Sequence, residues 1–166
     1  EREVTYKDFA ILMRATGGGK AVTYAEVLRE EGIPCFTEVS GEFLTSVEIS
    51  LILNILRVID NPKQDIPLLS VMMSPVFGFT ADDVAELRLP DKKCDIYTSL
   101  INMAENEKIS RFLSQIKYWR NLGVCLRVKE LIEEIYSATA LPSIFQAVDP
   151  SGIKRGNLML LCDYAD

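Results

Sequence analysis

The sequence contains no histidine, and its four cysteines are far apart in the chain. Histidines and paired cysteines supply most zinc and iron–sulfur ligands, and a Ser-His-Asp triad needs a histidine. None of the cysteines belongs to a Cys-x-x-Cys pair; they are Cys35, Cys94, Cys125 and Cys162. The sequence therefore predicts no metal site and no histidine-based catalysis in this chain, and it indicates free thiols in a reducing compartment.

Long apolar segments are also missing. A helix that spans a bilayer needs about 20 apolar residues, and no run in this sequence approaches that length. The first eight residues, EREVTYKD, are acidic and polar, unlike a secretory signal peptide. We expect no membrane association and a cytoplasmic location.

A complete phosphate-binding loop is a third absence, although one segment comes close to it. Residues 14–28 read RATGGGKAVTYAEVL, with a run of glycines and one lysine. The P-loop pattern requires a leading glycine to shape the turn, and a Ser or Thr after the lysine to bind Mg²⁺. Arg14 and Ala21 occupy these two positions. We therefore expect no nucleotide at Lys20.

The composition that remains is that of an ordinary globular protein, with 48% hydrophobic and 25% charged residues among 166. Near the N-terminus, FAILM (9–13) has the pattern of a buried strand, AVTYAEVLREEG (21–32) that of a helix ending at Gly32, and IPCFTEV (33–39) that of an alternating strand. We expect a right-handed, parallel β-α-β unit. Since two strands do not make a stable α/β sheet alone, this unit is expected to be part of a larger domain.

After residue 40 the pattern is helical. Thr45 and Glu48 have the spacing of a capping box, and the helix that they open is expected to stop at Asn61-Pro62. Thr80 is expected to cap the helix ADDVAELR, which has two aspartates at its positive end. The further helices that we expect are a short one beginning near 65 and others at about 95–105, 106–122, 128–139, 142–148 and 152–164.

Charge is unevenly distributed along the chain. The net charge of −6 argues against tight electrostatic binding of nucleic acid. Residues 1–107 hold 10 Lys and Arg against 18 Asp and Glu, whereas residues 108–129 hold six basic residues and no acidic one. On a helix, Lys108 and Arg111 lie beside an apolar stripe that includes Trp119, which we expect in the core. The two cations are either contacts to a phosphate backbone or part of a solvated helix face.

Three segments resemble a known family in their order and spacing: SGEFLTSVEI (40–49), LRVIDNPKQD (56–65) and SPVFGF (74–79). Together with the preceding FAILMR and GIP segments, they are similar to the C-terminal half of UvrD-like superfamily 1 DNA helicases. They look most like the AddA type of helicase–nuclease subunit. The resemblance runs from about residue 8 to residue 90 and continues more weakly through 126–141.

This resemblance implies that residues 1–40 are a part of the second RecA-like motor domain, 2A, and that residues 41–166 are most of the helical 2B insertion. The fold would be mainly α, with the β-α-β unit as a remnant of the motor domain. Arg14 would face the nucleotide cleft or would simply be a solvated arginine at a strand end. The three glycines that follow depart from the family, which often carries Ser and Arg there.

By the same resemblance, the parent protein would be an ATP-dependent DNA helicase and exonuclease of double-strand-break repair. It would use ATP and Mg²⁺ and a partner nuclease subunit of the AddB type, with no catalytic residue or cofactor site inside these 166 residues. Double-stranded DNA would be contacted weakly and without sequence preference by Gly78, Phe79 and Thr80, with Lys108 and Arg111 as secondary contacts. A helix cap alone would account for Thr80 equally well.

Two other interpretations remain open from the sequence. The chain could be an acidic helical module for protein interactions with no enzyme context, or it could belong to a monomeric repair helicase of the UvrD or PcrA type. Walker motifs in sequence upstream would indicate a helicase, and a nuclease domain downstream would indicate the AddA type. The absence of both would favour the interaction module.

Overall fold

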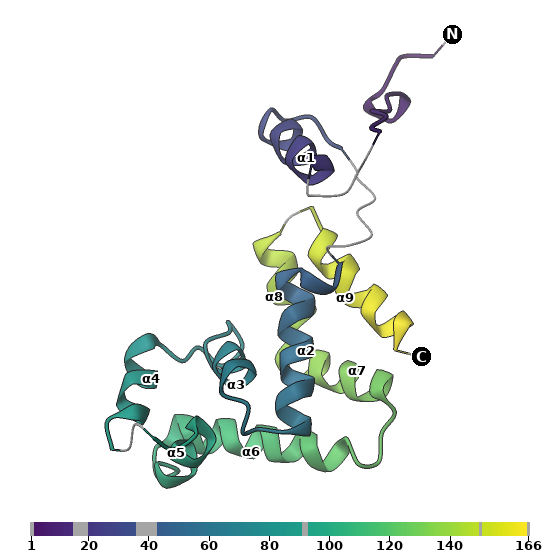
Figure 1. The fold of residues 1–166 in the computed structure, drawn as a ribbon. Helices are drawn as coiled ribbons and strands as arrows, with labels where there is room; N and C mark the ends of the chain where they lie inside the picture. The colour runs from purple at the N-terminus through teal and green to yellow at the C-terminus, as the bar shows by residue number, and fades with distance from the viewer. Residues whose placement is uncertain (1, 15–19, 36–42, 91–92, 150, 166) are drawn as a thin grey trace. The chain divides into compact units, whose positions relative to one another are not determined.

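The computed structural model describes residues 2–14, 20–35, 43–90, 93–149 and 151–165. Secondary structure in these ranges is helical, and none of them contains a strand (Figure 1). The α-helices are α1 (Lys20–Glu30), α2 (Val47–Asp60), α3 (Asp65–Met72), α4 (Ala81–Arg88), α5 (Ile96–Asn102), α6 (Glu107–Leu122), α7 (Val128–Thr139), α8 (Leu141–Val148) and α9 (Ile153–Tyr164). Two short 3₁₀ helices, η1 (Tyr6–Asp8) and η2 (Phe43–Thr45), precede α1 and α2. The mainly α fold class is confirmed.

The chain divides into two compact units, Glu1–Ser46 and Val47–Asp166. The predicted boundary at residue 40 lies outside the described residues, and the assignment of the two parts to domains 2A and 2B stays a prediction. In the described ranges, no helix is long and apolar enough to cross a membrane.

The β-α-β prediction for the first unit is not supported. Residues 9–13 are irregular rather than a strand, and most of their side chains are exposed, Leu12 at 96%. Of the second expected strand, 33–39, residues 33–35 have no regular structure and the remainder lies outside the described residues. An apolar run becomes a strand only when a neighbouring strand accepts its backbone hydrogen bonds, and the described ranges offer none.

The helix between those segments is confirmed, together with its predicted end. Gly32 has φ +76°, which is the left-handed conformation that favours glycine after a helix. The next amide, that of Ile33, donates to the carbonyl of Leu28 over 2.8 Å and closes the last turn of α1. Ala21 and Ala25 of this helix are buried.

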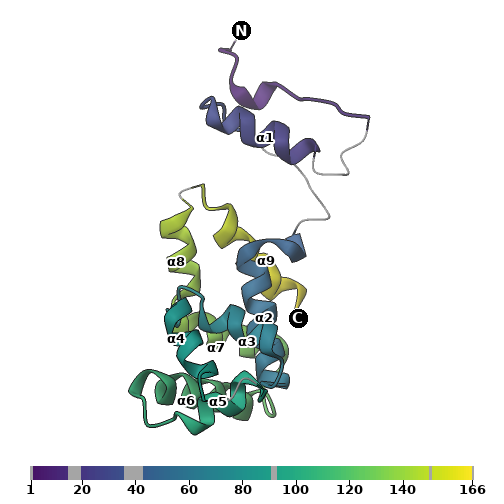
Figure 2. The ribbon, with the colours of Figure 1, turned by 60° about the vertical axis from the view of Figure 1, so that its left-hand side comes forward.

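Helix α2 is the centre of the second unit. It contacts α3, α6 and α9; α9 lies toward its N-terminal end and α6 crosses near its C-terminal end (Figures 1 and 2). Its apolar residues recur with helical spacing, and Ile49, Ile52 and Ile55 are completely buried. The helix stops at Asp60, before Asn61-Pro62, as predicted.

The start of α2 shows a role for Glu48 beyond the predicted capping box, whose hydrogen bonds stay a prediction. The helix begins at Val47, and Thr45 lies in the preceding 3₁₀ turn. Glu48 is 2% exposed, and its Oε1 accepts a hydrogen bond of 2.7 Å from Nδ2 of Asn157 in α9. The carboxylate therefore connects two helices that are 109 residues apart in sequence. Local spacing missed this because the partner comes from tertiary packing.

Helix α6 has the amphipathic character that its sequence predicts. Asn106 caps it, with the side-chain oxygen accepting from the amides of Lys108 and Ile109. The buried stripe consists of Ile109, Phe112, Ile116 and Trp119. Trp119 is completely buried, which confirms it as a core residue.

Candidate nucleic-acid interface

The segment 74–80, which we call the 74–80 loop, connects α3 to α4 and holds three of the predicted DNA contacts. Ser74 is buried and its hydroxyl donates to the carbonyl of Val71 over 2.6 Å. The amide of Gly78 donates back to the carbonyl of Ser74 over 2.8 Å. Gly78 has φ +60°, a left-handed conformation that costs most residues with a Cβ about 1 kcal/mol or more. The loop is therefore closed by its own backbone, with Gly78 exposed at its turn.

Thr80 caps α4 as predicted. Its Oγ1 accepts from the amide of Asp83 over 3.2 Å, and its own amide donates to Oδ2 of Asp83 over 2.8 Å. These reciprocal bonds form a capping box and satisfy two amides at the start of the helix. Thr80 is exposed, as is Gly78 two residues before it. A contact from Thr80 to phosphate stays a prediction.

Lys108 of α6 joins the loop and α4. Its Nζ donates to the carbonyl of Gly78 over 2.9 Å and to Oδ2 of Asp83 over 2.7 Å. The same ammonium lies 4.5 Å from the ring centre of Phe79, a cation–π distance. Lys108 thus contacts two of the predicted loop residues, although it is 30 residues away from Gly78 in sequence.

The electrostatic consequence falls on Asp83. The hydrogen bonds from the Lys108 ammonium and the Thr80 amide hold the pKa of the Asp83 carboxyl below its ordinary value of 3.8. The carboxylate is therefore ionised throughout the neutral range, and Lys108 already has an anionic partner. A phosphate at this site has to share or displace that partner.

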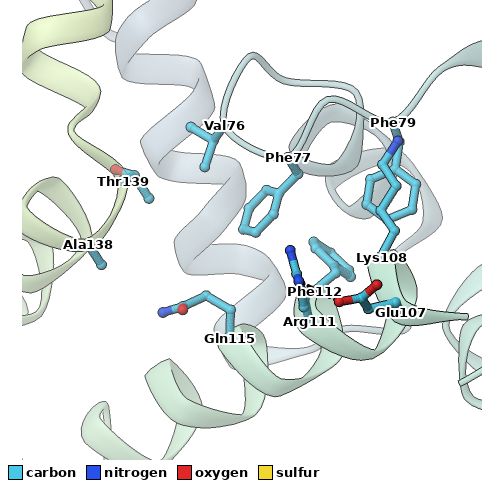
Figure 3. Close-up of a pocket in the computed structure, with 10 residues that line it drawn as sticks. All are labelled: Val76, Phe77, Phe79, Glu107, Lys108, Arg111, Phe112, Gln115, Ala138 and Thr139. Atoms are coloured by element: carbon cyan, nitrogen blue, oxygen red, sulfur yellow. Dashed lines mark hydrogen bonds and ion pairs between the residues drawn. The ribbon is translucent and has the colours of Figure 1, made fainter.

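Aromatic rings underlie the loop and attach it to α6 (Figure 3). Phe79 is 5% exposed and meets Phe112 edge to face, with ring centres 5.6 Å apart. Phe77 is half-buried, and its ring centre lies 4.8 Å from that of Phe112 and 6.2 Å from that of Trp119. The ring of Phe79 is buried, whereas Gly78 and Thr80 on either side of it are exposed, and the predicted DNA contact of Phe79 stays a prediction.

Arg111 lies one turn along α6 from Lys108 and forms an ion pair with Glu107, four residues before it in the same helix. All three side chains line a cavity of about 490 Å³ between the 74–80 loop, α6 and the end of α7. Figure 3 shows Phe77 pointing toward α6 on one side of this cavity and Thr139 on the other. Both cations that line the cavity are paired with a carboxylate, so neither offers an unneutralised charge to a ligand.

The remaining sequence predictions are not brought into this cluster. Arg14 belongs to the first unit and is exposed, and the glycines that follow it lie outside the described residues. Lys20 begins α1, and its lack of a nucleotide stays a prediction. No group of His, Cys, Asp or Glu in the described ranges is arranged to hold a metal ion.

Sequence reasoning missed two features of this region. The first is Asp83, which was recognised only as a helix-end acid, although it also binds Lys108 from 25 residues away. The second is a groove on the other side of α6, around Lys117 and Arg120. The run of six cations without an acid was the available signal, but the groups that face each cation come from neighbouring elements.

The described structure is thus a helical region in which a loop, closed by the helix cap of Thr80, lies beside the cation-bearing helix α6. The family follows from comparison with known proteins. Residues 1–148 match the UvrD-like helicase C-terminal domain, and the chain belongs to that family.

Curated relatives share this sequence over nearly its whole length. It is 38% identical over 170 residues to an ATP-dependent helicase/nuclease subunit of Acetivibrio thermocellus, and 38% identical over 165 residues to the protein of the same name in Leuconostoc mesenteroides. The corresponding value for Pelotomaculum thermopropionicum is 36% over 170 residues. Each alignment covers 99% of this chain but only 13% or 14% of the relative.

Proposed function

We propose that this chain is a region of an ATP-dependent DNA helicase–nuclease subunit of the AddA type, and that its helical unit contacts duplex DNA. The family and the relatives' names support the parent activity. ATP and Mg²⁺ would be bound by motor residues outside this chain, and a nuclease subunit of the AddB type would be the partner. The setting would be double-strand-break repair in the cytoplasm, with no catalytic residue contributed by these 166 residues.

The observation that carries the DNA-contact proposal is the position of the Lys108 ammonium against the carbonyl of Gly78 and the cap of α4. An exposed glycine, a threonine hydroxyl and a lysine are thereby gathered at one surface. Bare backbone and a helix N-terminus allow close approach to phosphates, and the lysine supplies charge. Such contacts recognise the backbone and carry no base sequence.

The energetic expectation is weak binding. Lys108 is neutralised by Asp83, and Arg111 by Glu107. The net binding free energy of a phosphate is therefore only the amount by which its attraction to these cations exceeds that of the two carboxylates. For the isolated chain we expect a Kd of about 10⁻⁴ M or weaker at physiological salt, with affinity falling as salt rises.

The test is Thr80→Asp, with Thr80→Ser as the matched control. Aspartate and serine both cap helices well, so the melting temperature of each variant should stay close to that of the unsubstituted chain. Aspartate adds a negative charge beside the loop and should lower affinity for a short DNA duplex at least threefold at low ionic strength. Serine should leave it unchanged.

The measurement is a titration of the ¹⁵N-labelled chain with duplex DNA, followed by NMR shifts around residues 78–83. Equal duplex affinity in folded Thr80→Asp and Thr80→Ser proteins would leave Thr80 with its capping role alone and would remove the loop from the proposed interface.

A further inference from the structure

Helix α6 carries two pairs of cations with the same spacing. Lys108 and Arg111 are three residues apart, and so are Lys117 and Arg120, nine positions further on. At 100° per residue, nine positions amount to two and a half turns. The second pair therefore lies on the side of α6 opposite to the first, with the buried stripe between them.

The second pair faces a groove of about 710 Å³, which we call the Lys117 groove. It lies between the end of α2, helix α5 and helix α6. Its cations are Lys63, Lys117 and Arg120, and hydroxyl groups are added by Tyr97, Ser110 and Ser114. Asp60 is the one carboxylate among its described lining residues. The groove therefore has an excess of positive charge.

The cations of the two sides differ in their partners. Lys108 and Arg111 each form an ion pair with a carboxylate. In the part of the chain that the structure describes, Lys117 and Arg120 form neither an ion pair nor a side-chain hydrogen bond. Two unneutralised cations one turn apart repel each other, and an external anion relieves that repulsion. The charge of this groove is available to a ligand without displacing an internal partner.

The other lining groups indicate what kind of anion fits. Tyr97 is half-buried in the groove wall, and Ile101 and Leu113 add apolar side chains to the same lining. A cationic groove with an aromatic ring is how proteins hold single-stranded nucleic acid, because phosphates meet the cations and an unstacked base lies on the ring. In a duplex the bases are stacked and paired, and the ring would have no base to meet.

We propose that the Lys117 groove binds single-stranded nucleic acid, with phosphates at Lys117 and Arg120 and a base against Tyr97. An acidic peptide would use the same cations, but it gives no role to the ring. This site is separate from the 74–80 loop, so the two proposals stand or fall independently.

The charge test uses Lys117→Gln/Arg120→Gln, with Arg155→Gln as the control. Arg155 is an exposed cation of α9, outside the residues that line the groove. Binding of a fluorescent oligothymidine is followed by anisotropy at several low salt concentrations. Each lost phosphate contact reduces the magnitude of the slope of log K against log salt by about 0.7. The slope of the double variant should therefore be smaller by about 1.4, and its affinity should be about tenfold weaker. Arg155→Gln should behave as the unsubstituted chain.

The ring test uses Tyr97→Leu, which keeps the apolar wall. Stacking on an aromatic ring is worth about 1–3 kcal/mol per base, so oligothymidine affinity should fall at least fivefold with little change in salt slope. Tyr97→Phe should retain binding. Circular dichroism and melting temperature verify that every variant is folded.

Several outcomes would overturn the proposal. They are no oligothymidine binding at low salt, an unchanged salt slope in the double variant, or unchanged affinity in folded Tyr97→Leu. A poly-glutamate peptide that binds more tightly than oligothymidine and is insensitive to Tyr97→Leu would assign the groove to acidic peptides. Thr80→Asp should weaken duplex binding alone, so failure at one site is distinguishable from failure at the other.

Discussion

The two polar sides of α6 carry the same residue types at the same spacing, yet their chemistry differs. On the loop side, Lys108 is hydrogen-bonded to Asp83 and to the Gly78 carbonyl. On the groove side, Lys117 and Arg120 have no such partners among the described residues. A lysine that holds a loop in place is part of the fold, whereas a lysine without an internal anion is available to bind an external one. Counting cations does not reveal which is which.

The two sides of α6 also differ in how their aromatic rings are packed. The loop side is attached to the core by aromatic rings, with Phe79 buried against Phe112. The groove side presents Tyr97 half-exposed and has room for a ligand. The loop side is therefore expected to respond to substitution mainly through stability, and the groove side mainly through binding.

The largest expected effect is the loss of a loop-side ring. Phe79→Ala removes a buried ring and should lower the free energy of unfolding by about 3–5 kcal/mol. Tyr97→Ala on the groove side should cost far less, because its ring is only partly buried. Urea unfolding followed by circular dichroism compares the two. Similar losses in both variants would show that the two sides do not differ in the way that their packing indicates.

A smaller effect is expected from the turn of the loop. Gly78→Ala should destabilise by about 1 kcal/mol, since φ +60° is unfavourable for a residue with a Cβ. Space is not the cause, because a Cβ at Gly78 meets no atom within 4 Å.

Gly156 in α9 is the matched control for that substitution. It is an exposed helical glycine whose added Cβ also meets nothing within 4 Å. Gly156→Ala should therefore stabilise by about 1 kcal/mol through helix propensity. Melting temperatures should move in opposite directions, and a rise in both would mean that the 74–80 loop tolerates another backbone conformation.

The smallest effect concerns pH. Because the folded state lowers the pKa of Asp83, this carboxylate contributes stability above its unfolded pKa, and the contribution is lost as pH falls through the lower, folded value. Lys108→Met removes the largest cause of the lowered pKa. The Lys108→Met variant should therefore be slightly less stable than the unsubstituted chain at pH 7, and this difference in the free energy of unfolding should shrink below about pH 4.

Lys117→Met provides the control from the groove side. Lys117 has no carboxylate partner in the described ranges. The difference in the free energy of unfolding between Lys117→Met and the unsubstituted chain should therefore change less with pH. Chemical unfolding at a series of pH values between 3 and 7 measures both variants. Parallel curves for the two would argue that the Lys108–Asp83 contact does not persist in solution.

Local signals predicted much of the helical unit. The stop of α2 at Asn61-Pro62, the capping of α4 by Thr80 and the burial of Trp119 in α6 were all confirmed. Each depends on residues within a few positions of one another, through a proline, a side-chain cap or helical periodicity. The same reasoning was wrong for the strand at 9–13, because apolar character does not supply a pairing partner.

The candidate site was only partly predictable. Gly78, Thr80 and Lys108 were named from the sequence, and the structure brings them together. The role of Asp83 as their common partner was missed. The Lys117 groove was missed as well, because its walls come from three helices that are separate in sequence.

The sequence by itself therefore determined the helices, several of their ends and the family to which the chain belongs, because these follow from order and spacing along the chain. Tertiary structure decided what each charged side chain does. Glu48 became the buried partner of Asn157, Lys108 became a contact to the loop, and Lys117 kept its charge free of any described partner. The physical reason is that the strength and availability of a charge depend on which groups lie within a few ångströms of it in space, and those groups come from distant parts of the chain.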